Sequence, residues 1–267
     1  LRPGGWHGDT TGQPPAPRSR ACDAKFGFAQ PAFTAALQEA VAAALENGVA
    51  TLAVAHAHTC TSLGYFTEQI AAAGLIGIGM TNASPVVAPP GGNKRVIGTN
   101  PIAMTVPGED GPVMHFDFST SAVALGKITM AKAAGEPIPL GWAVDENGAP
   151  TTDPDAALKG ALVSAGGYKG WGFGLMAELL AAGMTGSVNS LDVAGLKVAE
   201  GKPHDLGQFY ILMDPGTYHA DFGKRFARVA EAVAAQEGAR IPGADRKAAT
   251  VIDVPDDLWS LVLRLSA

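Results

Sequence analysis

A glycine-rich segment with one lysine is the stretch of this sequence whose residue types could bind a phosphate. It runs SAGGYKGWGFGLMAELLAAGMTG from Ser164 to Gly186, and Lys169 follows its first two glycines. Glycines let backbone N–H groups approach an anion closely, a following helix adds the positive end of its dipole, and a lysine adds a full charge. The spacing matches neither the P-loop pattern nor the Gly-x-Gly-x-x-Gly dinucleotide pattern. The segment therefore predicts either a phosphate cradle or a tightly packed entrance to a buried helix.

Three further strings place hydroxyl, amide and acidic side chains at the ends of expected strands. HTCTS carries Thr61 and Ser62 before a helix, where free N–H groups could hold a phosphate or the hydroxyls could simply cap the helix. DFSTS joins Asp117 to three hydroxyl residues, which suits a ribose and equally suits a helix cap. GTNPIA offers Thr99 and Asn100, whose side chains can bind a carboxylate or an amide, although most such strings are ordinary turns.

The sequence gives less support for a metal site or for a hydrolase. His56 and His58 would share one face of a continuing strand and could chelate a metal, but no third ligand lies nearby in the sequence. We therefore expect no metal site. Neither a Gly-x-Ser-x-Gly elbow nor an HExxH motif occurs, which argues against a serine hydrolase and a zinc protease.

Hydrophobic periodicity predicts the elements that would position these side chains. The clearest helix begins at Pro31, stops at Gly48 and has apolar residues four apart, namely Phe33, Leu37, Val41 and Leu45. Further helices are expected at 62–73, at 119–135 with Ser119 or Thr120 as its cap, within the glycine-rich segment 164–186, at 222–233 and at 258–265. Strands are expected at 49–55, 75–82 and 207–215, with short apolar pieces broken by Pro and Gly at 95–107 and 112–118, and a hairpin at Asn147-Gly148. Because many strands follow one another without a helix, we predict an α/β (α+β) fold with a mixed, largely antiparallel sheet flanked by helices.

Composition and charge limit the partners and the compartment. The 267 residues are 47% hydrophobic and 16% charged, with a mean hydropathy of +0.14, as in a globular protein. The net charge of −6 leaves no overall basic surface for nucleic acid or an anionic membrane, and no apolar run reaches the roughly 18 residues of a membrane span. Cys22 and Cys60 lie far apart without a CxxC spacing, so we expect a reducing cytoplasm. Residues 1–24 are dense in Pro, Gly and Arg and predict an irregular N-terminal remnant, ahead of a core over 25–267.

Taken in order, these strings resemble the malate/L-lactate dehydrogenase family of NAD(P)-dependent oxidoreductases, which does not use the Rossmann fold. The resemblance covers most of the chain from Lys25 onward and rests on FGFAQPA, HTCTSLGY, GLIGIGMTNAS, GTNPIA, DFSTSAVALGKI, GEPIPLGWAVDENGAPTTDP, GGYKGWGFGLMAELLAAGMTG and RIPG. GFAQP and PHDLGQFYILMDP are most similar to the branch of Δ1-piperideine-2-carboxylate and Δ1-pyrroline-2-carboxylate reductases. Those enzymes reduce a cyclic C=N bond beside a carboxylate.

The resemblance implies a nicotinamide cofactor, NADP or NAD with NADPH favoured, a small 2-imino or 2-oxo acid as substrate, and a homodimer. It places Thr99 and Asn100 near the substrate and the nicotinamide. Around the dinucleotide it places Thr59, Cys60, Thr61, Ser62, Leu63, Asp117, Phe118, Ser119, Tyr168, Lys169, Gly243 and Arg246. Their chemistry suits that role, since backbone N–H groups and cations bind phosphates while an acid and a hydroxyl bind ribose.

Two departures from the family pattern concern the proton donor. The family carries a histidine in a Ser-His-Gly motif, with an arginine beyond it for the substrate carboxylate, in an N-terminal helical segment. This sequence has no Ser-His-Gly, and His7 follows a tryptophan, so that role is not carried to His7. Lys127 stands where the imino acid branch can have an aspartate, and as a general acid it would need a buried position.

Three functions remain open on this basis. We favour reduction of a cyclic 2-imino carboxylate by hydride transfer from nicotinamide C4, followed by protonation of the nitrogen. A malate- or lactate-type 2-oxo acid dehydrogenase shares every motif. A catalytically inactive dinucleotide-binding remnant would follow from the missing Ser-His-Gly segment.

Overall fold

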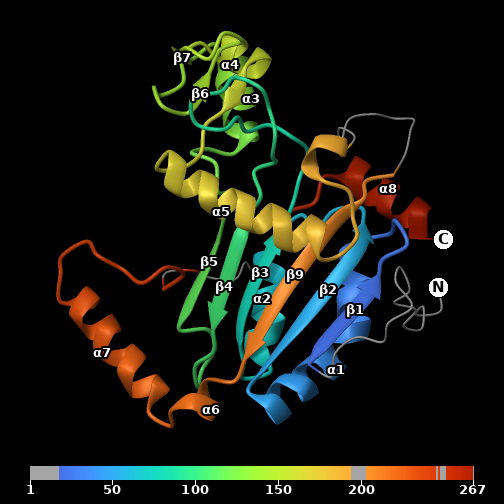
Figure 1. The fold of residues 1–267 in the computed structure, drawn as a ribbon, viewed down its shortest axis with the longest axis vertical. Helices are drawn as coiled ribbons and strands as arrows, with labels where there is room; N and C mark the ends of the chain where they lie inside the picture. The colour runs from blue at the N-terminus through green and yellow to red at the C-terminus, as the bar shows by residue number, and fades with distance from the viewer. Residues whose placement is uncertain (1–17, 194–202, 245, 247–250, 267) are drawn as a thin grey trace.

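The computed structural model of the protein describes residues 18–193, 203–244, 246 and 251–266. Its centre is a six-stranded sheet with the order β1-β2-β9-β3-β4-β5 (Figure 1). The strands are β1 (Ser19–Asp23), β2 (Val49–Ala57), β3 (Ile76–Thr81), β4 (Ile102–Val106), β5 (Met114–Phe118) and β9 (Leu206–Met213). Within this sheet β1 and β2 are parallel and the other neighbours are antiparallel, which confirms the predicted mixed, largely antiparallel sheet.

Helices α1 (Ala29–Asn47) and α2 (Gly64–Ala72) cover one face of the sheet and form the main core with it. α1 ends where the sequence predicts, because Gly48 adopts a left-handed φ of 80° at its C-terminus. The predicted apolar face is wrong at Leu45, which is 55% exposed. Small residues line the buried side instead, namely Ala29, Ala36, Ala40, Ala43 and Ala44 around Phe33. Alanines allow the helix axis to lie close to β2, and Leu45 is left on the outer side.

The opposite face carries helix α5 (Tyr168–Glu178) and the π-helical turn that continues it, Leu179–Gly183 (Figure 1). The turn and β9 approach to backbone contact at Gly207, where an added Cβ would lie 1.7 Å from the carbonyl oxygen of Ala181. A short 3-10 helix, Ser190–Asp192, follows. The segment singled out for its glycines is therefore a helix packed on the sheet.

A smaller three-stranded sheet, in the order β7-β6-β8, lies beyond one end of the main sheet (Figure 1). Its elements are β6 (Ala143–Val144), β7 (Pro150–Thr151) and β8 (Ala161–Leu162), with helices α3 (Leu125–Ala134) and α4 (Pro154–Lys159). They enclose a second apolar cluster that includes Ile128 and Leu162. The hairpin predicted at Asn147-Gly148 is confirmed, since β6 and β7 pair antiparallel across it.

The start predicted for α3 is wrong. The helix begins at Leu125, and neither Ser119 nor Thr120 caps it. The hydroxyl of Thr120 instead donates to the backbone carbonyls of Thr99 (3.1 Å) and Asn100 (3.2 Å). The Thr120 hydroxyl therefore forms a tertiary contact and not the helix cap that the local sequence predicts.

The described residues near the ends of the chain include one strand and several helices. Ser19–Asp23 forms β1, so the expectation of an irregular segment over 1–24 is wrong there; residues 1–17 lie outside the described part. After β9 come α6 (Pro215–Tyr218), α7 (Phe222–Ala234) and α8 (Asp256–Ser266), and the last two confirm predicted helices. Among the helices described, none has the length and apolar character needed to cross a membrane.

Candidate functional site

Asp117 lies at the carboxyl end of β5 and binds the start of α2. Its Oδ2 accepts a hydrogen bond of 2.7 Å from the backbone N–H of Gly64 and one of 3.2 Å from Ser62 Oγ. A carboxylate at the N-terminus of a helix is stabilised by the helix dipole. The acid predicted to bind a ribose therefore also orders the junction between β2 and α2, and its side chain remains exposed.

The Thr59–Leu63 junction turns tightly before α2. Thr61 adopts a left-handed φ of 61°, and the backbone N–H of Ser62 donates to the carbonyl of Cys60 at 2.8 Å. The side chains of Cys60 and Leu63 are buried, at 7% and 1% exposed. Burial, with a smaller contribution from the Asp117 carboxylate, raises the pKa of the Cys60 thiol to about 12.

The turn that follows Pro242 is docked on β5 through His115. The backbone N–H of His115 donates to the Pro242 carbonyl at 2.9 Å. Gly243 has a φ of 82°, and a Cβ there would lie 2.7 Å from the carbonyl oxygen of His115, so the contact requires glycine. At the end of the turn, the guanidinium of Arg246 pairs with Glu68 of α2. Gly243 therefore packs on His115 of β5, and Arg246 lies beside Glu68 of α2.

The His115 ring connects β4, β5 and α2. Its Nδ1 lies 2.8 Å from Thr105 Oγ1, which lies 2.8 Å from Thr67 Oγ1. A Cβ on Gly64 would approach its Cε1 to 2.7 Å. Burial lowers the pKa of His115 from its usual value, and the nearby Asp117 carboxylate opposes that shift. This packing fixes the start of α2 against the strand that carries Asp117.

A buried carboxylate ties the GTNP turn to α5. Glu178 is 5% exposed and accepts hydrogen bonds from Asn100 Nδ2 (2.8 Å) and from the N–H (2.7 Å) and hydroxyl (2.5 Å) of Ser190. Asn100 Nδ2 also donates to the carbonyl of Gly174 at 3.1 Å. Asn100 is fully buried at a φ of 34°, so its amide holds the turn in place, while Thr99 beside it is half-buried.

Thr120 connects this turn to the start of α5. Its backbone N–H donates to the carbonyl of Thr99 at 2.9 Å, and its own carbonyl accepts from the N–H of Ala165 at 2.9 Å. Phe118, two residues earlier, is 54% exposed. The DFSTS string therefore runs from the group around α2 to the group around α5, with Ser119 between them. The structure brings the predicted residues together in these two groups along one end of the main sheet.

The start of α5 presents glycines and one cation. Gly166 and Gly167 have φ values of 64° and 66° and turn the chain into the helix. Gly170 packs so closely that a Cβ would lie 2.0 Å from a carbonyl oxygen of the preceding loop. Tyr168 and Lys169 are exposed at the first turn, where the N–H groups of a helix have no partner within it.

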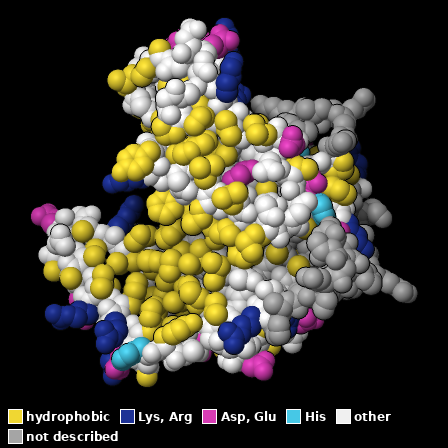
Figure 2. Space-filling model, in the orientation of Figure 1, with side chains coloured by type: hydrophobic (Ala, Val, Ile, Leu, Met, Phe, Trp, Pro, Cys, Tyr) yellow, Lys and Arg dark blue, Asp and Glu magenta, His cyan; other side chains and the backbone are white. Residues whose placement is uncertain are grey.

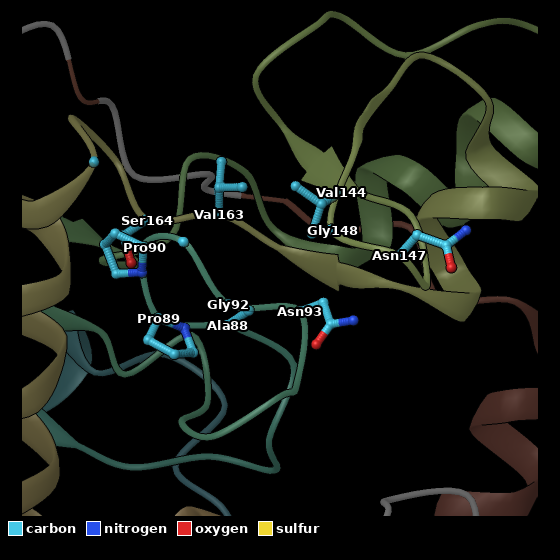
Figure 3. Close-up of a pocket in the computed structure, with 12 residues that line it drawn as sticks. Ala88, Pro89, Pro90, Gly92, Asn93, Val144, Asn147, Gly148, Val163 and Ser164 are labelled. Atoms are coloured by element: carbon cyan, nitrogen blue, oxygen red, sulfur yellow. The ribbon is translucent and has the colours of Figure 1, made fainter.

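A pocket of about 490 Å³ opens beside this helix start. In Figure 3, Pro90 and Ser164 lie close together at one end of the pocket, and Asn93 and Asn147 lie at the other. Gly91, Gly92, Gly148 and Gly167 also line it. The volume is typical of small-molecule sites, and glycine backbone leaves polar groups accessible within it.

Lys127 lies apart from both groups. It is on α3 of the smaller sheet, and its side chain is exposed. The buried position that a general-acid role would need is therefore not found in this chain.

The two histidines at the end of β2, His56 within the strand and His58 just after it, make other contacts. His56 Nδ1 lies 2.8 Å from Asp205 Oδ1, and the His58 ring lies 5.1 Å from that of His204. In the described part of the chain, no three His, Cys, Asp or Glu side chains are grouped as metal ligands would be.

Sequence reasoning missed Glu178, His115 and Glu68. Glu178 is the one acid within an otherwise apolar helix, and a lone acid in such a helix needs buried partners, which was the available signal. A single histidine in a short strand, PVMHFDF, was a weaker signal for His115. Nothing in the sequence marked Glu68, because its partner lies 178 residues away.

Comparison with known proteins defines the family. The sequence profile described as malate/L-lactate dehydrogenase matches residues 9–257, and the chain belongs to this family. A (2R)-3-sulfolactate dehydrogenase (NADP(+)) of Chromohalobacter salexigens is 39% identical over 85% of this chain and 68% of its own length. A Delta(1)-pyrroline-2-carboxylate/Delta(1)-piperideine-2-carboxylate reductase of Pseudomonas aeruginosa is 37% identical over 94% of this chain and 78% of its own length.

Solved structures agree with this assignment. The delta1-piperideine-2-carboxylate reductase of Pseudomonas syringae pv. tomato superposes with a TM-score of 0.77 at 36% identity, covering 86% of this chain and 70% of the other. The sulfolactate dehydrogenase of Methanocaldococcus jannaschii gives 0.83 at 29% identity, covering 94% and 76%. The fold predicted from the sequence is thus the fold of this family.

Proposed function

We propose that this chain binds NADPH or NADH and reduces a small cyclic 2-imino carboxylate of the Δ1-piperideine-2-carboxylate or Δ1-pyrroline-2-carboxylate type. The observation that carries the proposal is that Asp117 and Thr120 connect the two groups of predicted residues at one end of the sheet. Relatives named as reductases of these imines support the substrate, at 37% and 39% identity over most of the chain.

The proposed dinucleotide site extends from α2 to α5. Asp117, with the N–H groups of the Thr59–Leu63 junction and the Arg246 cation, would hold one end. Lys169 and the unpaired N–H groups of the first turn of α5 would hold the other. The residues fit the group by their chemistry, since an acid suits a ribose while cations and a helix N-terminus suit phosphates, and the pocket beside α5 has a volume of about 490 Å³.

The bound nicotinamide would supply the hydride, and the chain would supply position. Thr99, held by Thr120 and by the Asn100–Glu178 pair, would orient the substrate. Lys127 is the catalytic candidate of the sequence analysis, and its exposed place on α3 does not offer the buried position that a general acid would need. Lys127→Ala should lower kcat more than it changes KM; an unchanged kcat would remove it from the site.

Lys169→Ala tests the cofactor site. Loss of one charge-assisted hydrogen bond should raise the Kd for NADPH by about 1.5–3 kcal/mol, which is on the order of 10- to 150-fold. Lys159→Ala, at an exposed lysine at the end of α4, is the matched control and should bind NADPH as the unchanged protein does. Binding is followed by NADPH fluorescence, and equal affinities for the two variants would contradict the proposed site.

Two alternative functions have specific support. The sulfolactate dehydrogenase relative, at 39% identity, favours a 2-oxo acid, and competition between pyruvate and Δ1-piperideine-2-carboxylate for the NADPH-loaded protein decides between the substrates. A dinucleotide-binding protein without catalysis is the other function that the sequence leaves open. NADPH binding with no turnover of either acid would support that alternative.

We also propose a homodimer. Helix α5 and the π-helical turn after it expose large apolar side chains, since Phe173, Met176 and Leu179 are 56%, 39% and 64% exposed. Figure 2 shows a continuous hydrophobic area over the strands between α5 and α7. The double variant Phe173→Asp/Leu179→Asp should sediment as a monomer, whereas Met130→Asp on α3, 72% exposed, should not change the mass. A monomeric unchanged protein would refute the proposal.

A cytoplasmic location completes the proposal. The described cysteines Cys22 and Cys60 are free thiols, which suits a reducing compartment. Cell fractionation tests this, and recovery in a membrane or secreted fraction would contradict it.

A further inference from the structure

Arg246, a cation of the proposed dinucleotide site, is held by a carboxylate. Its guanidinium contacts Glu68 Oε1 in α2, one turn beyond Gly64, whose N–H is bound by Asp117. The two side chains are 52% and 33% exposed. The pair therefore lies at the surface beside Asp117, where a ligand can reach both members.

The surrounding structure fixes this pair in place. His115 Nδ1 lies 3.7 Å from Glu68 Oε1 on the inner side. The backbone N–H of His115 holds Pro242 at 2.9 Å, and Gly243 packs on the same residue. His115 therefore holds α2 and the turn that leads to Arg246 against the same strand.

The chemistry of the pair matches the one difference between the two nicotinamide cofactors. NAD has a hydroxyl at the 2′ position of its adenosine ribose, and NADP has a phosphate there. A carboxylate accepts hydrogen bonds from the ribose hydroxyls and repels a phosphate, whereas an arginine binds the phosphate through two parallel N–H bonds. Glu68 and Arg246 thus favour opposite cofactors from adjacent positions.

We propose that Glu68 sets the coenzyme preference of this protein: it competes with the 2′-phosphate for Arg246 and so allows NADH to bind as well as NADPH. This inference rests on the proposed dinucleotide site. Glu68 acts on the adenosine end of the cofactor and not on the reacting carbon. Its substitution should therefore alter KM for the cofactor and leave kcat unchanged.

The test measures binding of two adenosine fragments by calorimetry, 2′,5′-ADP and 5′-AMP, which differ only in the 2′-phosphate. Glu68→Gln keeps a hydrogen-bond acceptor for Arg246 but removes the charge, and should bind 2′,5′-ADP about tenfold more tightly. Arg246→Gln should bind 2′,5′-ADP about tenfold more weakly and 5′-AMP unchanged. Glu39→Gln, which removes the charge from the Glu39–Arg20 pair (3.4 Å), is the control and should change neither affinity.

The outcomes separate this inference from the proposed function. If Glu68→Gln weakens or does not change 2′,5′-ADP binding, Glu68 merely supports Arg246 and the inference is wrong, while NADPH binding by the unchanged protein still supports the proposed function. If the unchanged protein binds neither the fragments nor NADPH, both are overturned. KM values for NADPH and NADH should shift with the fragment affinities, at constant kcat.

Discussion

Replacing Glu178 by glutamine removes one charge and turns one acceptor into a donor at the centre of the buried network. The carboxylate accepts from Asn100 Nδ2 at 2.8 Å through one oxygen and from the Ser190 N–H at 2.7 Å through the other. An amide can place its oxygen toward only one of these donors. The other donor then faces an NH₂ group, and Asn100 cannot rotate to compensate without losing its bond to the Gly174 carbonyl.

The expected cost of Glu178→Gln follows from these contacts. A buried donor left without a partner costs about 1–3 kcal/mol, and the remaining bonds lose the strength that an ionised acceptor gives them. We expect the free energy of unfolding to fall by about 2–4 kcal/mol, a large part of the 5–15 kcal/mol typical of a domain. Because Glu178 fixes the GTNP turn, KM for the substrate should rise as well.

Urea unfolding followed by circular dichroism measures the change, with the m-value as a check that the unfolded state is the same. Glu146→Gln, at an exposed glutamate of the hairpin, is the control and should change stability by less than about 0.5 kcal/mol. Asn100→Ala should lower the free energy of unfolding less in the Glu178→Gln variant than in the unchanged protein, since the bond between residues 100 and 178 is already lost. A loss below about 1 kcal/mol for Glu178→Gln, or strict additivity with Asn100→Ala, would refute the reasoning.

Three further predictions follow from packing and protonation. Gly170→Ala should destabilise the protein by about 1–3 kcal/mol because its Cβ would lie 2.0 Å from the Ala165 carbonyl oxygen. Gly172→Ala, whose Cβ would have no atom within 4 Å, should stabilise α5 by about 0.5–1 kcal/mol. Thermal melts that rank the two variants in the opposite order would contradict this packing. The Cys60 thiol, with a pKa of about 12 against an ordinary 9.0, should react with iodoacetamide about a thousandfold more slowly in the folded protein than in urea, and equal rates would show that it is not buried. Because the pKa of His115 is lowered in the folded protein, the unfolded chain binds the proton more tightly, and the free energy of unfolding should fall as pH drops below about 6.5. His115→Gln should make this dependence on pH weaker. A variant with the same pH profile as the unchanged protein would exclude His115 as the cause of the dependence.

Local sequence signals predicted much of the fold where one residue decides the structure. Gly48 and Gly135 end α1 and α3 because each adopts the left-handed conformation that glycine favours. The Asn147-Gly148 turn gave its hairpin for a similar reason. Where several partners compete, the signals failed. The Thr120 hydroxyl had two possible uses, and only the folded chain shows that it binds the GTNP turn.

The same distinction applies to the candidate site. The residue types at Asp117 and Asn100 were visible in the sequence, but their present partners were not, because those come from distant elements. Asp117 binds the start of α2, 53 residues earlier, and Asn100 binds Glu178, 78 residues later. Strand β1 was missed because SRACD has no apolar alternation, and its pairing depends on the edge that β2 offers. Such contacts depend on the whole fold rather than on a motif.

The position of β9 determines how this chain can be synthesised and folded. β9 pairs with β2 on one side and β3 on the other, although about 150 residues separate it from β2. Until the ribosome has released residues 206–213, β2 and β3 each present an open edge that can pair with another chain. Contacts over such distances form slowly, because the intervening loop must close first. Nascent chains should therefore depend on chaperones until β9 emerges, and a ribosome that stalls before Leu206 would leave a product prone to aggregation.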